Sequence, residues 1–288
     1  MNNSCVLSLS CADKPGLVAQ VAGFLAAHGG NITDAEQYND PETQRFFMRV
    51  EFNSGSASAD ALRVAFAPIA AANGMDWKLR SPGYRPKVLL MVSKFDHCLV
   101  DLLYRERIGE IAMDVVAVVS NHERGPDKDG GSAGMLEGAP YFHCPVTRDT
   151  KPQQEAKVRS IIEESGAELI VLARYMQILS DEMAGYLSGR CINIHHSFLP
   201  GFKGAKPYHQ AHARGVKMIG ATSHYVTTDL DEGPIIAQDV VAIGHRESAE
   251  ELVAKGRDVE RRVLARAVKA HLEDRVFLNG ARTVVFAR

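Results

Sequence analysis

The first 80 residues alternate between strand-like and helix-like patterns of apolar positions. Apolar and polar residues alternate over residues 5–10 and again over 46–52, which is the period of a half-buried strand. Apolar residues recur at helical spacing from Leu17 to Leu25, after a turn at residues 13–16. The remaining predicted elements are a strand over 31–38 that would pair with 46–52, a helix over 59–72 and a strand over 75–79. This βαββαβ order predicts a small ferredoxin-like domain.

The rest of the chain repeats short apolar strands separated by helical stretches. Strands are predicted over 87–92, 115–120, 169–173, 191–194, 219–226 and 235–243, with helices over 154–165, between Pro207 and Gly215, and from a capping box at Ser248. Such alternation predicts an α/β fold with a doubly wound, mostly parallel, Rossmann-like sheet. Asn279-Gly280 predicts a terminal hairpin. We therefore predict domains over 1–80 and 87–288, joined by a linker over 81–86 that holds two prolines.

Composition narrows the possible partners of the chain. With 288 residues, 45% hydrophobic content and a net charge of -2, the chain offers no overall basic surface, so we expect no nucleic acid partner. No run of about 18 apolar residues and no secretion-type start is visible, which argues against a membrane location. The five scattered cysteines form no C-x-x-C pair, and this favours a reducing, cytoplasmic setting.

Three polar residues interrupt apolar strands where catalysis is expected. Asn193 and His195 lie at the end of a predicted strand, and ligands of open parallel sheets bind outside such ends. Together with Asp231 they offer an oxyanion donor, a proton-handling imidazole and an orienting carboxylate, which suits attack on a carbonyl. The alternative for each residue alone is a structural role at a strand end or turn.

Several further histidines invite a metal interpretation. His196, His209, His212 and His224 lie in the same half of the sequence, and His209 and His212 could share a helical face. They lack a recognised ligand spacing such as H-E-x-x-H, so we expect hydrogen-bonded cleft residues and no metal.

The run NIHHSFLPGFKGAKPYHQA and the later HYVTTDLDEGPII resemble the folate-dependent formyltransferase-fold family, and within it the branch that hydrolyses 10-formyltetrahydrofolate to tetrahydrofolate and formate. The resemblance implies that Asn193 binds the oxyanion while Asp231 and His195 activate water. It also implies a part in one-carbon and purine metabolism. No cofactor and no metal are expected, since the tetrahydrofolate derivative is the substrate.

The resemblance further implies a pterin cleft formed by residues 174–179 and 227–230. The expected substrate-binding residues are Met176, Gln177, Ile178, Leu179, His196, Ser197, Thr228 and Leu230. The alternative for Met176, Ile178 and Leu179 is ordinary core packing. Relatives that transfer formyl to a phosphorylated amine carry a glycine-rich loop after the first strand, whereas residues 92–98 here are bulky. Water therefore becomes the expected nucleophile, unless Lys94 or His97 binds an anion.

The N-terminal unit resembles ACT domains through its D-K-P-G-L turn and its G-G-N-I segment. The resemblance implies a homo-oligomer, a dimer or tetramer, with an amino acid or similar effector bound between copies. A dimerisation module without a ligand is the alternative. For the whole chain, two other functions stay open: a formyltransferase acting on an unidentified amine, and a catalytically silent folate or amino-acid sensor.

Overall fold

The computed structural model describes residues 4–123, 138–201 and 207–287. The chain forms two compact units, and each is described by itself. The first contains Met1–Tyr84, Glu273–Asn279 and Val284–Arg288, and the second contains Arg85–Leu272 and Gly280–Thr283. The sequence-based boundaries placed all of residues 87–288 in one domain, whereas the contacts group most of the C-terminal tail with the first unit.

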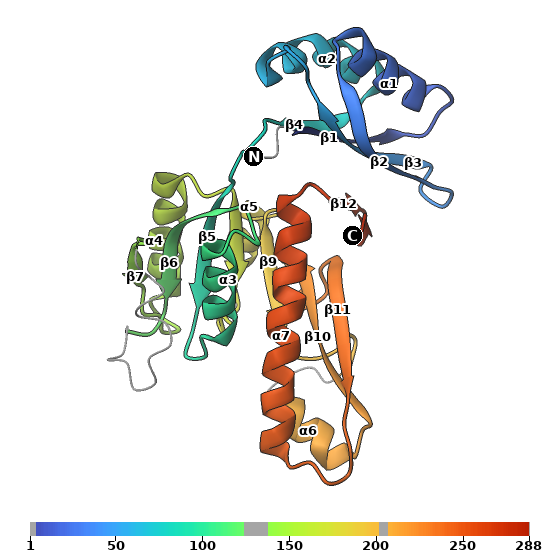
Figure 1. The fold of residues 1–288 in the computed structure, drawn as a ribbon. Helices are drawn as coiled ribbons and strands as arrows, with labels where there is room; N and C mark the ends of the chain where they lie inside the picture. The colour runs from blue at the N-terminus through green and yellow to red at the C-terminus, as the bar shows by residue number, and fades with distance from the viewer. Residues whose placement is uncertain (1–3, 124–137, 202–206, 288) are drawn as a thin grey trace. The chain divides into compact units, whose positions relative to one another are not determined.

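The first unit is a four-stranded antiparallel sheet with two helices. Its elements are β1 (Ser4–Ala12), α1 (Leu17–Ala27), β2 (Asn31–Asp40), β3 (Arg45–Asn53), α2 (Ala59–Asn73) and β4 (Asp76–Arg80), and the strand order is β2-β3-β1-β4. Both helices cover one face of this sheet (Figure 1). The predicted βαββαβ order and the conditional pairing of residues 31–38 with 46–52 are confirmed.

The two faces of this sheet are covered differently. Alternate residues such as Leu7, Leu9 and Val50 join the helices in one buried apolar core. On the other face, Phe47 meets Phe277 edge to face with ring centroids 5.7 Å apart. Arg49 Nε donates to the carbonyl of Glu273 at 3.0 Å. These contacts explain why the tail groups with the first unit, since its aromatic and polar side chains complete that face.

The second unit is built on a seven-stranded sheet. Its strands are β5 (Lys87–Val92), β6 (Asp114–Ser120), β7 (Tyr141–His143), β8 (Leu169–Leu172), β9 (Cys191–His195), β10 (Met218–Tyr225) and β11 (Ile235–Ala242), in the order β11-β10-β9-β8-β5-β6-β7. The pairs from β9 to β7 are parallel, and β10 and β11 are antiparallel. A doubly wound, mostly parallel sheet is therefore confirmed.

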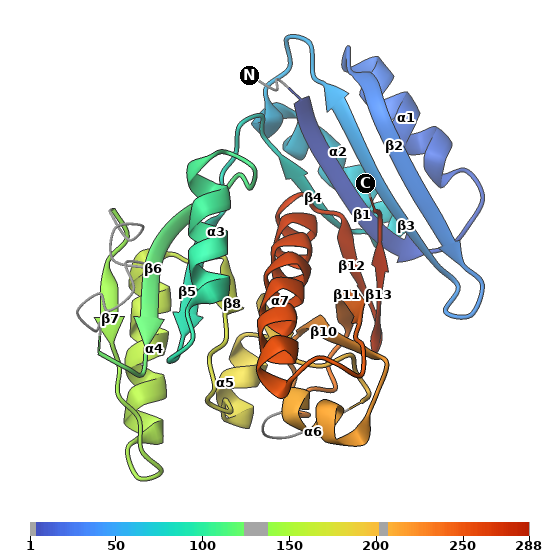
Figure 2. The same cartoon turned by 60° about the horizontal axis from the view of Figure 1, so that its bottom comes forward.

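Helices cover both faces of the second sheet, as Figure 2 shows. They are α3 (His97–Arg107), α4 (Lys151–Ser165), α5 (Asp181–Tyr186), α6 (Pro207–Arg214) and α7 (Ala249–Leu272). Val158 and Ile162 of α4 pack with Met183 of α5 on one face, where they bury Leu89 and Ile170. On the other face α3 and α7 lie side by side.

Two sequence motifs correctly predicted where a helix begins and where a hairpin turns. The capping box that opens α7 is formed, because the backbone N of Ser248 donates to Glu251 at 2.7 Å and the backbone N of Glu251 donates to the Ser248 hydroxyl at 3.2 Å. The hairpin is also formed, by β12 (Val276–Asn279) and β13 (Arg282–Val285). The short elements β7 and α5 were not predicted. The F-K-G-A-K part of the sequence motif, residues 202–206, lies outside the described residues.

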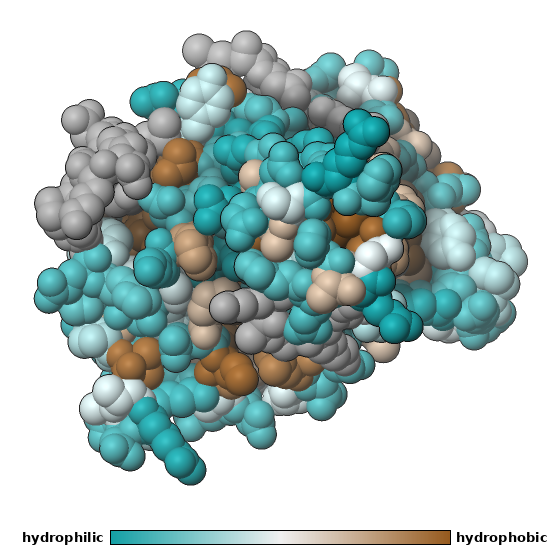
Figure 3. Space-filling view, turned by 90° about the horizontal axis from the view of Figure 1, so that it is seen from below, coloured by the Kyte–Doolittle hydropathy of each residue, from teal (hydrophilic) through white to brown (hydrophobic). Residues whose placement is uncertain are grey.

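One face of the molecule can be judged from its surface colouring (Figure 3). On the face seen in Figure 3, hydrophilic side chains predominate and hydrophobic ones form several small separate groups. Among the helices of the described residues, none is long and apolar enough to cross a membrane.

Candidate active site

The pairing of β9 with β10 builds one half of the site. In this antiparallel register Asn193 lies directly opposite His224, and the Asn193 side-chain amide lies 3.3 Å from His224 Nε2. The other ring nitrogen, Nδ1 of His224, donates to the Tyr225 carbonyl at 2.8 Å. A histidine on β10 is therefore oriented by its own strand and turned toward the end of β9.

Asp231 reaches the same place through a tight loop after β10. It adopts a left-handed backbone conformation, φ 58°, which aspartate tolerates better than most residues. Two residues later, a Cβ on Gly233 would lie 1.8 Å from the Tyr225 carbonyl oxygen, so only glycine fits there. The D-x-G-P motif thus folds the loop back against the end of β10 and returns the carboxylate to the strand ends.

Two histidines hold the Asp231 carboxylate. His195 Nδ1 lies 3.2 Å from Oδ2, and His224 Nε2 lies 3.6 Å from Oδ1. Burial by itself would raise the pKa of Asp231, but the contacts with His195 and His224 outweigh burial and lower that pKa well below its usual range. The carboxyl group is therefore ionised at neutral pH.

His195 has one ring nitrogen engaged and one available. Its side chain is 6% exposed, and with Nδ1 directed at Asp231, the buried Nε2 finds no hydrogen-bond partner among the described residues. A buried nitrogen without a partner is costly unless a ligand or water meets it. This atom is the one that the site offers to a reacting group.

His196 stacks on His195, with ring centroids 5.2 Å apart. Burial, together with the positive charge of Arg174 and the neighbouring His195, lowers the pKa of His196 to about 4. His196 is therefore neutral at physiological pH.

A cleft of about 530 Å³ opens at these strand ends. Asn193, His195 and Asp231 all line it, together with Met176, Gln177, Ile178, Leu179, His196, Thr228 and Leu230. The predicted residue Ser197 is not among the lining residues, because its buried hydroxyl donates to the Gly201 carbonyl at 2.6 Å. Ten of the eleven site residues expected from the sequence therefore line one cleft.

Three of the four apolar residues that the sequence assigned to the substrate are exposed and do not pack in the core. Met176, Ile178 and Leu230 are 52%, 60% and 56% exposed. Leu179, in contrast, is partly buried against the apolar core of α4 and α5. Exposed apolar side chains next to buried polar ones suit a flat, partly aromatic ligand.

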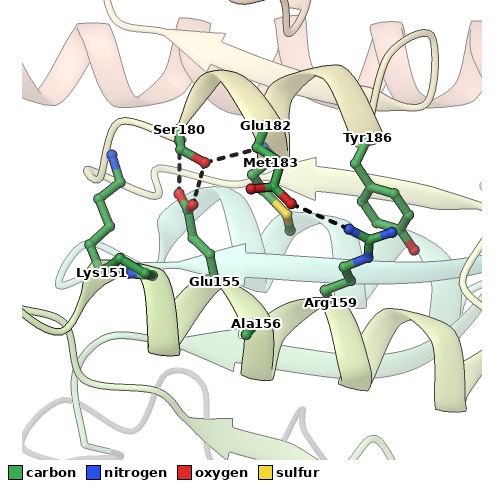
Figure 4. A pocket seen from close by; sticks show the side chains of 9 residues that line it. Lys151, Glu155, Ala156, Arg159, Ser180, Glu182, Met183 and Tyr186 are labelled. Carbon is green, nitrogen blue, oxygen red and sulfur yellow. Dashed lines mark hydrogen bonds and ion pairs between the residues drawn. The ribbon is translucent and has the colours of Figure 1, made fainter.

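A second hollow of about 390 Å³ lies between α4 and α5 (Figure 4). Several of its polar groups bind one another: Glu155 accepts from the Ser180 backbone N at 2.8 Å and from the Ser180 hydroxyl. The Arg159 guanidinium lies over the Tyr186 ring, 4.2 Å from its centroid. These contacts hold the two helices together.

The histidines considered as metal ligands are dispersed. His209 and His212 are exposed on α6, while His224 faces the cleft. Within the described part of the chain, His97, Cys98 and Glu260 form the one group of three potential ligands. The Arg174 guanidinium, 3.2 Å from Glu260, already supplies positive charge there, so the group does not fit a cation.

The comparisons with known proteins identify the family of the chain. The family "Formyl transferase" matches residues 86–268, and "ACT domain" matches residues 6–61. A formyltetrahydrofolate deformylase from Corynebacterium sp. is 52% identical over 97% of both chains. The chain belongs to the formyltetrahydrofolate deformylase family. Both resemblances drawn from the sequence are confirmed.

Two solved structures show which known folds the chain is similar to. The crystal structure of formyltetrahydrofolate deformylase from Burkholderia mallei has a TM-score of 0.92 and 54% identity, covering 99% of this chain and 100% of its own. Glycinamide ribonucleotide transformylase 1 from Symbiobacterium toebii, at 28% identity and a TM-score of 0.63, covers 73% of this chain and 98% of its own. This deformylase-family chain therefore shares the fold of its second unit with transferases.

Two features of the deformylase cleft were missed from the sequence. His224 entered only as a possible metal ligand, although its place opposite Asn193 follows from the β9–β10 pairing. Arg174 was noted only as the start of a loop, and its side chain meets Glu260, 86 positions along the chain, at 3.2 Å. His97 hydrogen-bonds Glu260 at 2.8 Å through Nε2, so it is not free to bind an anion as one alternative supposed.

Proposed function

We propose that the protein hydrolyses 10-formyltetrahydrofolate to tetrahydrofolate and formate. The observation that carries this function is the meeting of Asn193, His195 and Asp231 in one cleft, with His195 Nε2 buried and free of protein partners among the described residues. The activity named for the relatives supports the same substrate.

In the first step, water adds to the formyl carbon. The ionised Asp231 accepts from His195 Nδ1, which fixes the ring so that Nε2 carries the lone pair. As the water oxygen bonds to the carbon, its proton passes to Nε2 and the carbonyl electron pair moves onto the formyl oxygen. The Asn193 amide donates to this oxyanion, and Asp231 stabilises the charged imidazole.

In the second step, the tetrahedral intermediate collapses. The bond between carbon and the folate nitrogen breaks, and the proton held on His195 Nε2 passes to that nitrogen. One water is consumed, formic acid and tetrahydrofolate leave, and His195 returns to its starting state. The formic acid loses its proton to solvent and becomes formate. Because Asp231 stays ionised at neutral pH, its charge is present throughout the cycle.

The substrate's pterin ring is assigned to the apolar side of the cleft. Met176, Ile178 and Leu230 offer exposed apolar surface, and the loop that holds Thr228 offers backbone groups for the polar edge. His196 lines the same cleft and, being neutral, adds no charge to it.

The N-terminal unit is assigned a regulatory role. A hollow of about 730 Å³ is lined by the turn at Asp13–Gly16 and by Gln37 and Asn39, which places polar groups beside an apolar floor. An amino acid or similar small effector suits this chemistry, in a cytoplasmic homo-oligomer. Isothermal titration with single amino acids, alongside sedimentation, tests effector and oligomer together.

The test of the function is formate release from the purified protein in metal-free buffer. The substrate is 10-formyltetrahydrofolate, and no amine acceptor is added. Formate over many turnovers, matched by tetrahydrofolate, is the expected result. Folate binding without formate would overturn the proposal and favour either a transferase deprived of its acceptor or a silent sensor.

A further inference from the structure

The strand order of the second sheet marks a place where a ligand is expected. From β5 the chain continues to β6 on one side and later returns to β8 on the other. In doubly wound sheets, ligands bind in the crevice at the carboxyl ends of the two strands flanking such a reversal. Here these ends lead into Ser93 and into Arg174, whose backbone carbonyl accepts from the Ser93 N at 3.2 Å.

The chain's own side chains gather at this crevice. Arg174 Nε lies 3.2 Å from a Glu260 carboxylate oxygen. The same carboxylate accepts from His97 Nε2 at 2.8 Å and from the Tyr208 hydroxyl at 2.6 Å. These four residues, here called the Glu260 network, come from the start of α3, the end of β8, α6 and α7.

The Glu260 network is buried, and Nε and Nη1 of Arg174 have no hydrogen-bond partner among the described residues. The Glu260 side chain is 1% exposed and that of Arg174 is 11% exposed. Burial would raise the pKa of Glu260, but the hydrogen bond from His97 and the charge of Arg174 outweigh it and lower the pKa. Tyr208 packs so closely on α7 that a Cβ on Gly256 would lie 2.1 Å from its ring.

Burying the charged groups of the Glu260 network costs free energy. Removing two charges from water costs several kcal/mol per ion before pairing. Arg174 also adopts φ 66°, a left-handed conformation that disfavours any residue with a bulky side chain. Neither water attack nor protonation of the leaving nitrogen uses Glu260, so the chemistry of hydrolysis leaves this cost unexplained.

The Glu260 network borders the catalytic residues directly. Arg174 lines the cleft together with His195 and His196. The His196 ring stacks on His195 and lies 6.4 Å from the Tyr208 ring, centroid to centroid. The network therefore lies beside the reacting centre, in the crevice at the carboxyl ends of β5 and β8.

We propose that the Glu260 network occupies the acceptor-binding crevice of this fold, so that water rather than an amine attacks the formyl group. The proposal rests on the hydrolytic function proposed above.

An amine admitted to the crevice would bond through its nitrogen to the formyl carbon and lose a proton to His195 Nε2. The bond to the folate nitrogen then breaks, that nitrogen takes the proton, and a formamide leaves in place of formate. Arg174 is the residue on which the specificity depends most, because its guanidinium lies between the cleft and Glu260.

The test measures how the formyl group partitions between water and an added amine. Arg174→Gly removes the guanidinium, and glycine suits φ 66°. Wild type and variant receive 10-formyltetrahydrofolate with glycinamide, at a pH where its amine is largely uncharged, and formate and N-formylglycinamide are quantified. Arg159→Ala, which alters an arginine between α4 and α5, is the matched control. An enzyme-free reaction gives the background.

The expected result is a ratio of N-formylglycinamide to formate that rises about tenfold or more in Arg174→Gly. Wild type and Arg159→Ala should share the same low ratio, with formate as the main product. If thermal denaturation shows that Arg174→Gly does not fold, Arg174→Gly combined with Glu260→Gln replaces it, since removing both buried charges avoids an unpaired carboxylate. Partial unfolding lowers the amounts of both products and leaves their ratio unchanged. A change in the ratio therefore reports acceptor specificity and not stability.

Three results would overturn the proposal. The first is formate as the sole product of a folded, active variant. The second is complete loss of turnover in folded variants, which would place the Glu260 network in the chemistry itself. The third is failure of both variants to fold, which would make the network structural only. Failure of the proposed function is separate, because it would show as absent formate release by the wild type.

Discussion

Replacing Asp231 by asparagine tests the proposed mechanism most directly. The asparagine side chain has nearly the same shape, so the loop, the cleft volume and the apolar seat stay in place. Its amide carries no charge and can present NH₂ to His195 Nδ1 instead of an acceptor. The ring would then turn its lone pair toward the new amide and lose the tautomer that leaves Nε2 free for water.

The magnitude follows from the contacts that are lost. Asp231 both orients His195, at 3.2 Å, and stabilises the positive charge that forms on its ring. Replacing an aspartate with this role in a serine protease lowers kcat about 10⁴-fold. Asp231 also meets His224 and keeps some solvent contact, so we expect a loss of about 10³- to 10⁴-fold, or ~4–5.5 kcal/mol in the barrier.

The assay separates chemistry from binding. Single-turnover formate release gives the rate of the chemical step, and fluorescence titration with a non-hydrolysable folate gives the dissociation constant. The expected result is a large fall in the rate of formate release with little change in the dissociation constant of the folate. The apolar cleft residues assigned to the pterin ring keep their side chains in this variant. Asp258→Asn, which changes an exposed carboxylate paired with Arg261, is the control. An Asp231→Asn enzyme with more than about a tenth of wild-type rate would refute the assigned role.

The same substitution has a consequence for stability. Because the pKa of Asp231 is lowered in the folded state, its ionised form stabilises the fold at pH values above its unfolded pKa of about 3.9. That contribution is lost as the pH falls toward the folded pKa. The difference in thermal stability between wild type and Asp231→Asn should therefore shrink as the pH falls below about 4. A constant difference across this range would contradict the ionised assignment.

Three further predictions follow from the geometry of the cleft. Gly233→Ala would force a Cβ against the Tyr225 carbonyl and should cost ~2–4 kcal/mol of unfolding free energy together with activity, measured by denaturant titration and formate release. His196→Gln should flatten the loss of stability between about pH 6.5 and about pH 4, since His196 resists protonation when folded and takes up a proton on unfolding; thermal scans against pH test this. Ile178→Ser, at a side chain 60% exposed, should raise KM several-fold by losing ~1 kcal/mol of apolar contact with the substrate while leaving the melting temperature unchanged.

The strand ends and the helix cap could be predicted from the sequence, because each depends on residues that are neighbours in the chain. The strand ends that carry Asn193 and His195 follow from apolar runs, and the Ser248 capping box follows from four consecutive residues. The loop to Asp231 was recognised by its motif, although its left-handed backbone and the close approach at Gly233 became evident only in three dimensions. Features that depend only on neighbouring residues can be predicted without knowledge of the whole fold.

Contacts between distant positions could not be predicted in the same way. Glu260 lies on a helix whose sequence gives no sign that one of its acidic residues is buried, since many polar residues surround it. Its partners His97 and Arg174 come from two different strand ends, and only the order of strands in the sheet brings them together. The C-terminal tail is similar. Phe277 lies in the predicted hairpin and Asp274 just before it, but their partners Phe47 and Arg80 lie 230 and 194 positions earlier in the chain.

The two halves of the second sheet thus carry different parts of the function. The antiparallel pair of β9 and β10 supplies Asn193 and the loop to Asp231, a set that suits attack on a formyl carbon by any nucleophile. The junction of β5 and β8 decides which nucleophile can enter, because Arg174 lies there against a buried carboxylate. A chain can therefore keep the chemistry of formyl activation and change its acceptor by altering residues that never touch the formyl group. This separation explains how one fold accommodates both transfer and hydrolysis.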